Sequence, residues 1–419
     1  MHVLLLTNYF PPEISAASHL YYDLAEALIM RGHKVTVLTG TPRYNISAEI
    51  AKYYLRKKIH VETDKGMTII RVRMPLYAKK QKIKRGMEYF TVSSKLNTAL
   101  NLLENDIDVC LTYSPPLPIG KTAVLISRKF KIPVVFNVQD IHPQALIDLG
   151  ILKNKLIIFY LKGLEKRVYN SVSLITVHSE KNADIVRNLL NRNKNRVEVM
   201  HNWIDVTKLT PGEKNNDFSK KHGLLRKFVV SFAGNLGTSQ DIEVIIRAAD
   251  KLKNIPDILF LIVGDGVKKQ ETENLIKELG LENVLLLPAV KRDTYSLVLH
   301  SSDISLVTLM VDVRTPVVPS KILSIMSAGI PVIATMNLDG DAPKLIERAK
   351  AGYALPAGDA KGLAEKILEL YNNPDLRKKL GKNGREYVEK NLSVQVAADK
   401  YEEIFKKVIK EYKRRNKHG

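Results

Sequence analysis

The stretch PSKILSIMSAGIP, residues 319–331, is the strongest local indication of the fold class. An apolar, strand-like run at 303–309 precedes it, and Val332 begins another. Pro and Ser suit the first turn of a helix, and Gly329 and Pro331 suit its end. The helix would bury one apolar face, made of Ile322, Leu323, Ile325 and Met326. The order strand, loop, helix, strand is typical of a parallel α/β sheet.

The start of this helix is a candidate anion site. The first helical turn has unpaired N–H groups and a partial positive charge, which can hold a diphosphate. Lys321 lies in that turn, where a cation is unfavourable unless an anion lies nearby. We therefore predict that Ser320 and Lys321 bind a phosphate group. The simpler alternative is an ordinary α/β turn with a solvated lysine.

The chain of 419 residues carries a net charge of +21. Its length predicts two or three domains, and its charge favours an anionic partner. Zinc-finger, RNP-type and helix-turn-helix patterns are absent, so no nucleic acid is expected. A thermophilic, ion-paired composition would not explain the excess of basic residues. The single cysteine, Cys110, fits a reducing, cytosolic setting without disulfides or cysteine metal clusters. No apolar run reaches the roughly 18 residues of a membrane span, and MHVLLLTNYF indicates a first strand rather than a signal peptide.

The first half opens with a strand at 2–6, a helix at 19–30 and a strand at 34–38. Such β-α-β units build parallel sheets that bind ligands at the carboxyl ends of their strands. The loop after the first strand should therefore face a ligand, and we place Glu13 and Ser15 there on the acceptor side. It lacks GxGxxG, so the dinucleotide fingerprint is absent. Residues 39–64 are predicted to be a loop region followed by a Tyr- and Lys-rich segment.

A basic run follows a strand at 67–73. Its cations are Lys79, Lys80, Lys82, Lys84 and Arg85, and Tyr77, Ile83, Met87, Tyr89 and Phe90 lie beside them. Basic and aromatic side chains together favour contact with an anionic membrane or a lipid diphosphate. The alternative is a solvated charged face.

The strand at 133–138 ends in Gln139-Asp-Ile-His-Pro. Asp140 and His142 should thus lie at the ligand-binding edge of the sheet. We predict that Asp140 orients or deprotonates a hydroxyl and that His142 hydrogen-bonds a sugar or phosphate. The alternative is a capping aspartate beside a surface histidine.

A polar linker at 206–226 separates the halves. We predict an acceptor domain at 1–205, a donor domain at 206–397, and a final helix at about 398–419 that packs back on the first. Two glycine-rich turns, at 233–237 and 264–266, follow strands of the second half and permit close approach of backbone to phosphate or ribose. Residues 339–344 are predicted to be a polar loop, and the chain from 360 onward is predicted to be mostly helical.

Eight motifs in this order resemble the retaining glycosyltransferases of family 4, over essentially the whole chain. They are YFPPE (9–13), RGHKVTV (31–37), NVQD (137–140), NWID (202–205), AGNLG (233–237), VGDG (263–266), PSK (319–321) and AGIPVIA (328–334). The branch that looks most similar includes WbuB-like L-fucosamine transferases. The resemblance implies the GT-B fold, in which two Rossmann-like, doubly wound parallel-sheet domains face a cleft.

The resemblance also implies the sites. Phosphate would lie at Gly234, Asn235 and Gly237 with Ser320 and Lys321, the base near Val263, Gly264 and Val290, and the ribose near Ser324. The family needs neither a metal nor a cofactor, because protein cations and N–H groups stabilise the leaving diphosphate. Lys321, Asp140 and His142 would be the catalytic groups.

Several positions depart from the family pattern. The two family glutamates, eight residues apart, would fall at Pro316 and Ser324, and neither is acidic. The usual cations after the Ala-Gly turn are replaced by Asn235 and Gln240, with Lys321 and Arg43 as candidate substitutes. The first loop has Ala16-Ala17 in place of two glycines.

The favoured interpretation is a cytoplasmic, membrane-associated enzyme. It would transfer an N-acetylated hexosamine or deoxyhexosamine from a UDP-sugar to a polyprenyl-diphosphate-linked glycan in surface polysaccharide synthesis. One alternative is a nucleotide-sugar epimerase of the same fold, and another is a non-catalytic protein that binds lipid or other anions.

Overall fold

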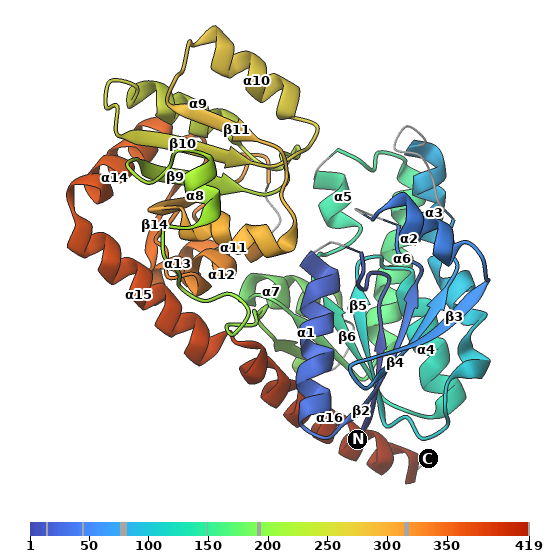
Figure 1. Cartoon of the computed structure of the whole chain (residues 1–419). Coiled ribbons are helices and arrows are strands. Elements are labelled where there is room, and N and C mark those ends of the chain that lie inside the picture. Colours follow the sequence, from blue (N-terminus) through green and yellow to red (C-terminus); the bar gives the residue numbers. More distant parts are fainter. Residues whose placement is uncertain are drawn as a thin grey trace. The chain divides into compact units, whose positions relative to one another are not determined.

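The computed structural model describes residues 1–13, 16–43, 46–75, 82–148, 150–190, 194–313 and 318–417. Within these ranges the side chains of residues 16, 82–88, 292–293 and 416–417 are not described. The chain forms two compact units (Figure 1): residues 1–203 with 394–419, and residues 204–393. The boundaries proposed from the sequence were 205/206 and about 398.

The first unit contains an eight-stranded sheet in the order β3-β4-β2-β1-β5-β6-β7-β8. Its strands are β1 (His2–Leu6), β2 (Lys34–Gly40), β3 (Ile59–Asp64), β4 (Met67–Val72), β5 (Val109–Ser114), β6 (Val134–Val138), β7 (Leu174–Val177) and β8 (Val197–Val199). Among the strands that the structure describes in this unit, only β3 pairs antiparallel, at the edge beside β4. Strand β1 is central because it pairs with both β2 and β5.

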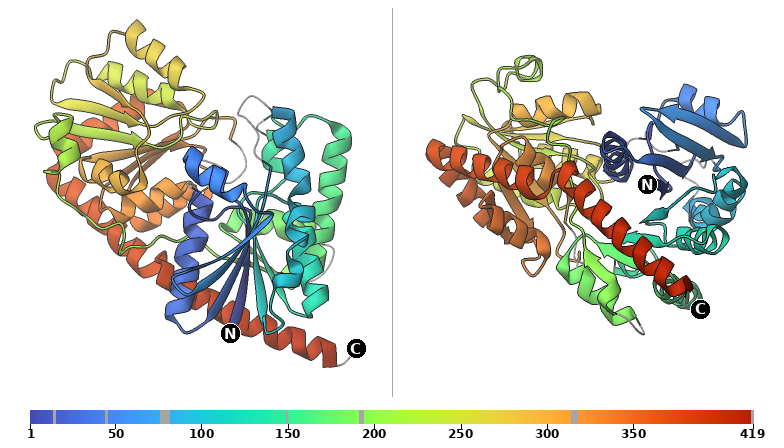
Figure 2. Two further views of the ribbon diagram at one scale, coloured as in Figure 1. Left: turned by 45° about the vertical axis from the view of Figure 1, so that its right-hand side comes forward. Right: turned by 90° about the horizontal axis from the view of Figure 1, so that it is seen from below.

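Helices cover both faces of this sheet (Figure 2). One face carries α1 (Ala16–Met30) and α16 (Val394–Lys417), and the other carries α3 (Lys82–Asn97), α4 (Ile119–Phe130), α6 (Lys155–Ser171) and α7 (Glu180–Leu189). Short helices α2 (Ala48–Tyr54) and α5 (Gln144–Asp148) and the turns η1 (Leu100–Leu102) and η2 (Lys194–Arg196) complete the unit. Side chains alternate across β1: Val3 and Leu5 face α1, and Leu4 and Leu6 face the other layer. Burial on both faces explains why the strand is continuously apolar.

Helix α16 is held in the first unit by buried aromatic and polar contacts. The Tyr401 ring meets the Trp203 ring edge-on at 5.6 Å between centroids. Asn137 Nδ2 donates to the Tyr401 hydroxyl at 3.2 Å, and Trp203 Nε1 donates to the Leu20 carbonyl at 3.0 Å. The last helix therefore belongs to the same core as β6 and α1.

The second unit contains a fully parallel six-stranded sheet in the order β11-β10-β9-β12-β13-β14. The strands are β9 (Phe228–Ala233), β10 (Ile258–Val263), β11 (Val284–Leu287), β12 (Ile304–Thr308), β13 (Val332–Met336) and β14 (Gly352–Pro356). The chain first builds outward from β9 to β11 and then returns to pair β12 with β9. Ligands of doubly wound sheets bind at the carboxyl ends of the strands beside such a reversal.

Helices α9 (Ile242–Lys251), α10 (Lys269–Glu278) and α14 (Ala360–Asn372) pack on one face of this sheet. The opposite face carries α8 (Asp217–Lys221), α11 (Arg292–His300), α12 (Ser320–Ser327), α13 (Asp341–Ala349) and α15 (Pro374–Asn391). These layers confirm the predicted class of doubly wound, mostly parallel α/β sheets. Across the described residues no helix is long and apolar enough to cross a membrane.

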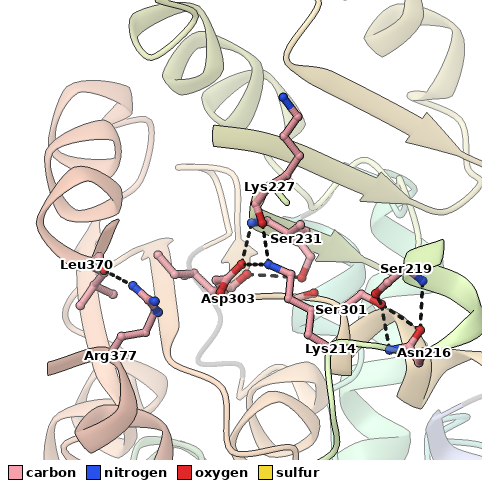
Figure 3. A network of polar contacts seen from close by, with 12 residues as sticks. Lys214, Asn216, Ser219, Lys227, Ser231, Ser301, Asp303, Leu370 and Arg377 are labelled. Carbon is pink, nitrogen blue, oxygen red and sulfur yellow. Dashed lines mark hydrogen bonds and ion pairs between the residues drawn. The ribbon is translucent and has the colours of Figure 1, made fainter. Parts of the chain in front are cut away.

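The predicted polar linker is partly wrong, because residues after 213 are anchored in the second unit (Figure 3). Lys214 Nζ pairs with Asp303 and donates to the Lys227 carbonyl at 2.6 Å. Asn216 caps α8 by accepting from the Ser219 N–H at 3.0 Å, and the Ser219 hydroxyl donates to Ser301 at 2.7 Å. Short-range composition did not reveal these long-range partners.

Two further loop predictions are wrong. Residues 39–64 contain α2 and β3, and the edge strand β3 lacks a continuous apolar run because only one of its residues, His60, is buried. Residues 341–344 begin α13, where Pro343 lies in the first turn. Proline is tolerated there because the first-turn N–H groups have no intrahelical partner.

Candidate functional site

The two glycine-rich turns of the second unit touch each other at the carboxyl ends of β9 and β10. A Cβ atom on Gly264 would lie 1.9 Å from the Gly234 carbonyl oxygen, and one on Gly266 would lie 2.3 Å from that of Leu236. The Leu236 N–H donates to the Asp265 carbonyl at 2.9 Å. Glycine is needed here because the two backbones are in direct contact, and Gly234 also has a φ of +150°.

Lys321 extends from the first turn of α12 to this surface. Its Nζ donates to Gln240 Oε1 at 2.8 Å and lies 3.7 Å from the centroid of the Phe232 ring. A Cβ on Gly234 would be 3.0 Å from that Nζ. Burial lowers the pKa of Lys321 to about 7. No carboxylate of the described residues pairs with it, so a bound anion would stabilise its charged form.

Lys268, which was not predicted from the sequence, supplies a second cation. It directly precedes α10, and its Nζ lies 3.2 Å from the Gln240 carbonyl oxygen and 3.4 Å from Met310 Sδ. Met310 follows β12, and its N–H donates to the Ser239 carbonyl at 3.0 Å. The segments after β9, β10 and β12 therefore meet around Gln240. Lys268 comes two residues after Gly266. Its place directly after a glycine-rich turn was the sequence feature that could have identified it as a site residue.

The other predicted donor residues lie on the same edge. Ser320 is exposed at the start of α12, whose N-cap, Pro319, makes no side-chain cap. Ser324 is half-buried, and its hydrogen bond to Tyr295 opposes the burial that raises the tyrosine pKa to about 12. Asn235 is exposed, and Gly237 is buried beside it. Val290 is half-buried near the carboxyl end of β11.

Asp140 and His142 follow β6 in the first unit, as predicted. Burial raises the pKa of the half-buried Asp140, whose carboxylate accepts no hydrogen bond from the part of the chain that the structure describes. The His142 ring stacks on the Tyr89 ring at 6.0 Å between centroids, and the Tyr89 hydroxyl is 3.2 Å from His142 Nδ1. Burial lowers the pKa of His142 to about 4, so the ring is neutral near pH 7.

The predicted acceptor residues of the first unit are only partly described. Glu13 follows β1 and its side chain is fully buried. Ser15, Lys79 and Lys80 lie outside the described residues, as does Pro316 at the missing glutamate position. Lys82, Lys84 and Arg85 belong to α3, but their side chains are not described. Arg43 donates from Nη2 to Asn8 Oδ1 at 3.1 Å, within the first unit.

One group of side chains among the described residues has metal-ligating spacing: His2, Glu104 and Asp106. It lies at the amino end of β1, in the first unit. The Lys34 ammonium already pairs with both carboxylates, and Asp106 also accepts from His2 Nδ1 at 2.7 Å. The cluster is thus a network of hydrogen bonds and ion pairs. Hydrogen bonds from His2 and then Lys34 lower the pKa of Asp106 to about 2.

Comparisons with known proteins match both units. Residues 17–208 match the family model "Glycosyltransferase Family 4", and residues 214–387 match "Glycosyl transferases group 1". The two units are glycosyltransferase domains. A relative in Escherichia coli K12 is WcaI, whose name describes a glycosyl transferase of colanic acid biosynthesis. It is 24% identical over 362 residues, covering 83% of this chain and 86% of WcaI. WbjE of Pseudomonas aeruginosa, which carries a glycosyltransferase name, is 25% identical, covering 81% of this chain and 85% of WbjE.

Solved glycosyltransferases share the fold. Anabaena HepE in complex with UDP has a TM-score of 0.71 at 16% identity, covering 97% of this chain and all of that one. WaaG, a glycosyltransferase of lipopolysaccharide biosynthesis, has a TM-score of 0.65 at 14% identity, covering 96% and 99%. These similarities confirm the GT-B class for this glycosyltransferase. The WbuB-like branch stays a prediction.

Proposed function

We propose that the chain is a retaining, metal-independent glycosyltransferase that uses a UDP-sugar. The observation that carries the proposal is Lys321, a half-buried cation without a carboxylate partner among the described residues, beside two touching glycine turns. A diphosphate fits this chemistry, because exposed backbone and a cation at a helix start favour a negatively charged ligand.

The proposed catalytic work is stabilisation of the leaving diphosphate. Negative charge develops on the diphosphate as the bond to the sugar breaks, and preorganised donors in a site of low polarity stabilise it most. Lys321 and the N–H groups at the start of α12 would supply these donors. Lys268, whose Nζ contacts the Gln240 carbonyl oxygen, would add a second cation. A divalent metal is then not required for this step.

Names of relatives support the sugar classes that we propose. HepE was crystallised with UDP and with UDP-glucose, which supports a uridine nucleotide. N-acetyl-alpha-D-glucosaminyl L-malate synthase of Bacillus anthracis is 24% identical over 241 residues, covering 57% of this chain. That relative's name supports an N-acetylated hexosamine as the transferred sugar, and a deoxyhexosamine stays the alternative that the sequence resemblance suggests.

We further propose a polyprenyl-diphosphate-linked glycan as the acceptor, at the cytoplasmic face of the cell membrane. WcaI and the capsular polysaccharide glycosyltransferase CapM of Staphylococcus aureus, 28% identical over 207 residues, support polysaccharide synthesis. Asp140 would orient the acceptor hydroxyl, and neutral His142 would hydrogen-bond the acceptor. The hydroxyl would attack from the face that the diphosphate leaves, its proton passing to the leaving phosphate, so the anomeric configuration is retained.

A transfer assay tests this function. UDP release from a panel of UDP-sugars would be measured in EDTA, with and without a polyprenyl-diphosphate-linked glycan, and the product linkage would be determined by NMR. The proposal predicts acceptor-dependent UDP release in EDTA and a retained anomeric configuration. Conversion of the donor to an isomer without acceptor would instead indicate an epimerase. An absence of turnover with every donor would favour a non-catalytic anion-binding protein.

A further inference from the structure

Helix α6 of the first unit exposes large apolar side chains on its amino-terminal half. Phe159 is 81% exposed and Leu156 is 80% exposed, and Ile151, just before the helix, is 67% exposed. Leu156 and Phe159 are three residues apart, so they lie on one side of the helix. Leu161, Leu164 and Val168 form its buried stripe. The outer apolar residues are therefore additional to the ones that attach α6 to the core.

Neighbouring helices extend this surface. The Phe90 ring of α3 lies 6.3 Å from the Tyr160 ring of α6. Lys121 of α4 donates from Nζ to the Tyr160 hydroxyl at 2.6 Å and lies 5.3 Å from the ring centroid. Phe90 and Tyr160 are each about two-fifths exposed. We call Ile151, Leu156, Phe159, Tyr160 and Phe90 the α6 surface.

The charge around the α6 surface is mostly positive. The exposed charged residues of α6 are all basic: Lys155, Lys162, Lys166 and Arg167. Asp148, three residues before Ile151, is an exposed acid, and Glu88 precedes Phe90 in the sequence. Lys153 precedes the helix and is exposed as well. Glu165, the one acidic residue of α6, is buried. In the sequence, Lys82, Lys84 and Arg85 begin α3, the helix that supplies Phe90.

We propose that the α6 surface inserts into the headgroup region of an anionic lipid bilayer. Helices that lie in the interface of a membrane combine bulky apolar side chains with lysine and arginine. Transfer of exposed leucine and phenylalanine side chains from water to the acyl boundary lowers the free energy. The surrounding cations are attracted to anionic lipid headgroups. The absence of exposed acids from α6 complements such a lipid surface. The inference rests on the proposed function, since a lipid-linked acceptor lies in a membrane.

The test is sedimentation of the full chain with vesicles of phosphatidylglycerol and phosphatidylethanolamine, compared with phosphatidylcholine alone. The variant Leu156→Ser/Phe159→Ser removes the two most exposed apolar groups without touching the core. Its matched control is Met30→Ser/Val61→Ser, whose side chains are 75% and 61% exposed on α1 and β3. A charge variant, Lys155→Glu/Lys162→Glu, is compared with Lys57→Glu/Lys58→Glu, two lysines exposed elsewhere in the unit.

The wild type is expected to sediment with anionic vesicles more than with neutral ones. Both α6 variants should lower the partition coefficient by roughly tenfold or more, which corresponds to about 1.4 kcal/mol, and neither control should do so. Unchanged partition of the α6 variants, or no sedimentation of the wild type, would overturn the inference. A wild-type dimer that the α6 variants dissociate, with vesicle binding unchanged, would also overturn it, in favour of a protein interface.

UDP binding, measured on the same samples, separates this inference from the proposed function. If UDP binds and the α6 variants sediment normally, the membrane surface is wrong and the function stands. If the wild type fails to bind UDP, the function fails whatever the vesicles show.

Discussion

Lys321 Nζ lies 2.8 Å from Gln240 Oε1, while Lys268 Nζ lies 3.2 Å from the carbonyl oxygen of the same glutamine. Two lysines from different helical regions thus meet at one neutral residue. Gln240 stands in the region where the family pattern has cations. We infer that Lys321 and Lys268 supply the positive charge that this region of the sequence lacks.

Replacement of Lys321 by methionine tests its role as a phosphate ligand. Methionine keeps much of the apolar stem but removes the charge, and hydrogen bonds to charged groups are worth about 1.5–3 kcal/mol. UDP affinity should fall by roughly 10- to 100-fold in calorimetry, and turnover should fall with it. Lys253→Met is the control, because Lys253 is exposed and pairs only locally with Asp250. Wild-type affinity in Lys321→Met would remove this lysine from the site.

Lys268→Met should weaken UDP binding less, by roughly fivefold, or about 1 kcal/mol. Its ammonium already contacts the Gln240 carbonyl and Met310, so it has fewer donors to offer. Lys269→Met is a close control, because Lys269 pairs with Asp265. If both neighbouring variants weaken binding equally, the effect is general electrostatics, and Lys268 has no specific role.

The pH dependence of UDP affinity follows from Lys321. Its pKa is about 7 in the free protein because burial disfavours the charge, and a bound diphosphate would raise it. The affinity for UDP is therefore highest below about pH 7. It decreases as the pH rises toward the lysine pKa of the complex, by up to roughly tenfold per pH unit. The UDP affinity should be measured above pH 7, because phosphate itself titrates near pH 6.

Binding should also take up a proton near pH 8, which calorimetry detects as a dependence on the ionisation enthalpy of the buffer. Lys321→Arg is the control, since arginine stays charged over this range and should show no such uptake. A wild-type affinity that stays flat from pH 7 to 9 would contradict the lowered lysine pKa.

Asp140→Asn should reduce turnover by roughly 10²- to 10⁴-fold if the carboxylate positions or deprotonates the acceptor. UDP affinity should stay within twofold of the wild type, because Asp140 lies in the first unit and the glycine turns lie in the second. The two effects are read from separate turnover and calorimetric experiments. A parallel loss of UDP affinity would show that the variant disturbs more than the acceptor.

The contact between the glycine turns is a matter of stability as well as function. Gly264→Ala would place a Cβ atom 1.9 Å from the Gly234 carbonyl oxygen, and relief of such a clash should cost about 2–3 kcal/mol. Gly163→Ala is the opposite case. It lies in α6 with nothing within 4 Å of a Cβ, so it should stabilise the first unit by about 0.5–1 kcal/mol. Thermal unfolding should show a lower melting temperature for Gly264→Ala and a higher one for Gly163→Ala than for the wild type.

Most strands, and the placement of the glycine turns and Lys321 at one sheet edge, were predictable from the sequence because the signals are local. An apolar run such as 258–263 followed by Gly-Asp-Gly indicates a strand and its turn without knowledge of the rest of the chain. Lys321 was predictable because a cation at a helix start is unusual. These signals depend only on neighbouring residues.

The missed features depend on distant partners. Helix α8 is fixed by Ser301 and lies near Lys214, which pairs with Asp303, and no local pattern specifies them. Lys268 differs from Lys269 only in what it contacts: the first reaches Gln240, and the second pairs with Asp265. The exposed position of Phe159 is equally invisible in the sequence, where Ile157, Ile158 and Phe159 look like one apolar run.

The most direct test of the central claim is a calorimetric titration of the purified protein with UDP in EDTA, repeated with GDP and ADP. We predict that UDP binds without metal, that GDP and ADP bind more weakly, and that Lys321→Met loses most of the UDP affinity. A requirement for a divalent metal, or equal UDP affinity in wild type and Lys321→Met, would contradict the proposed diphosphate site.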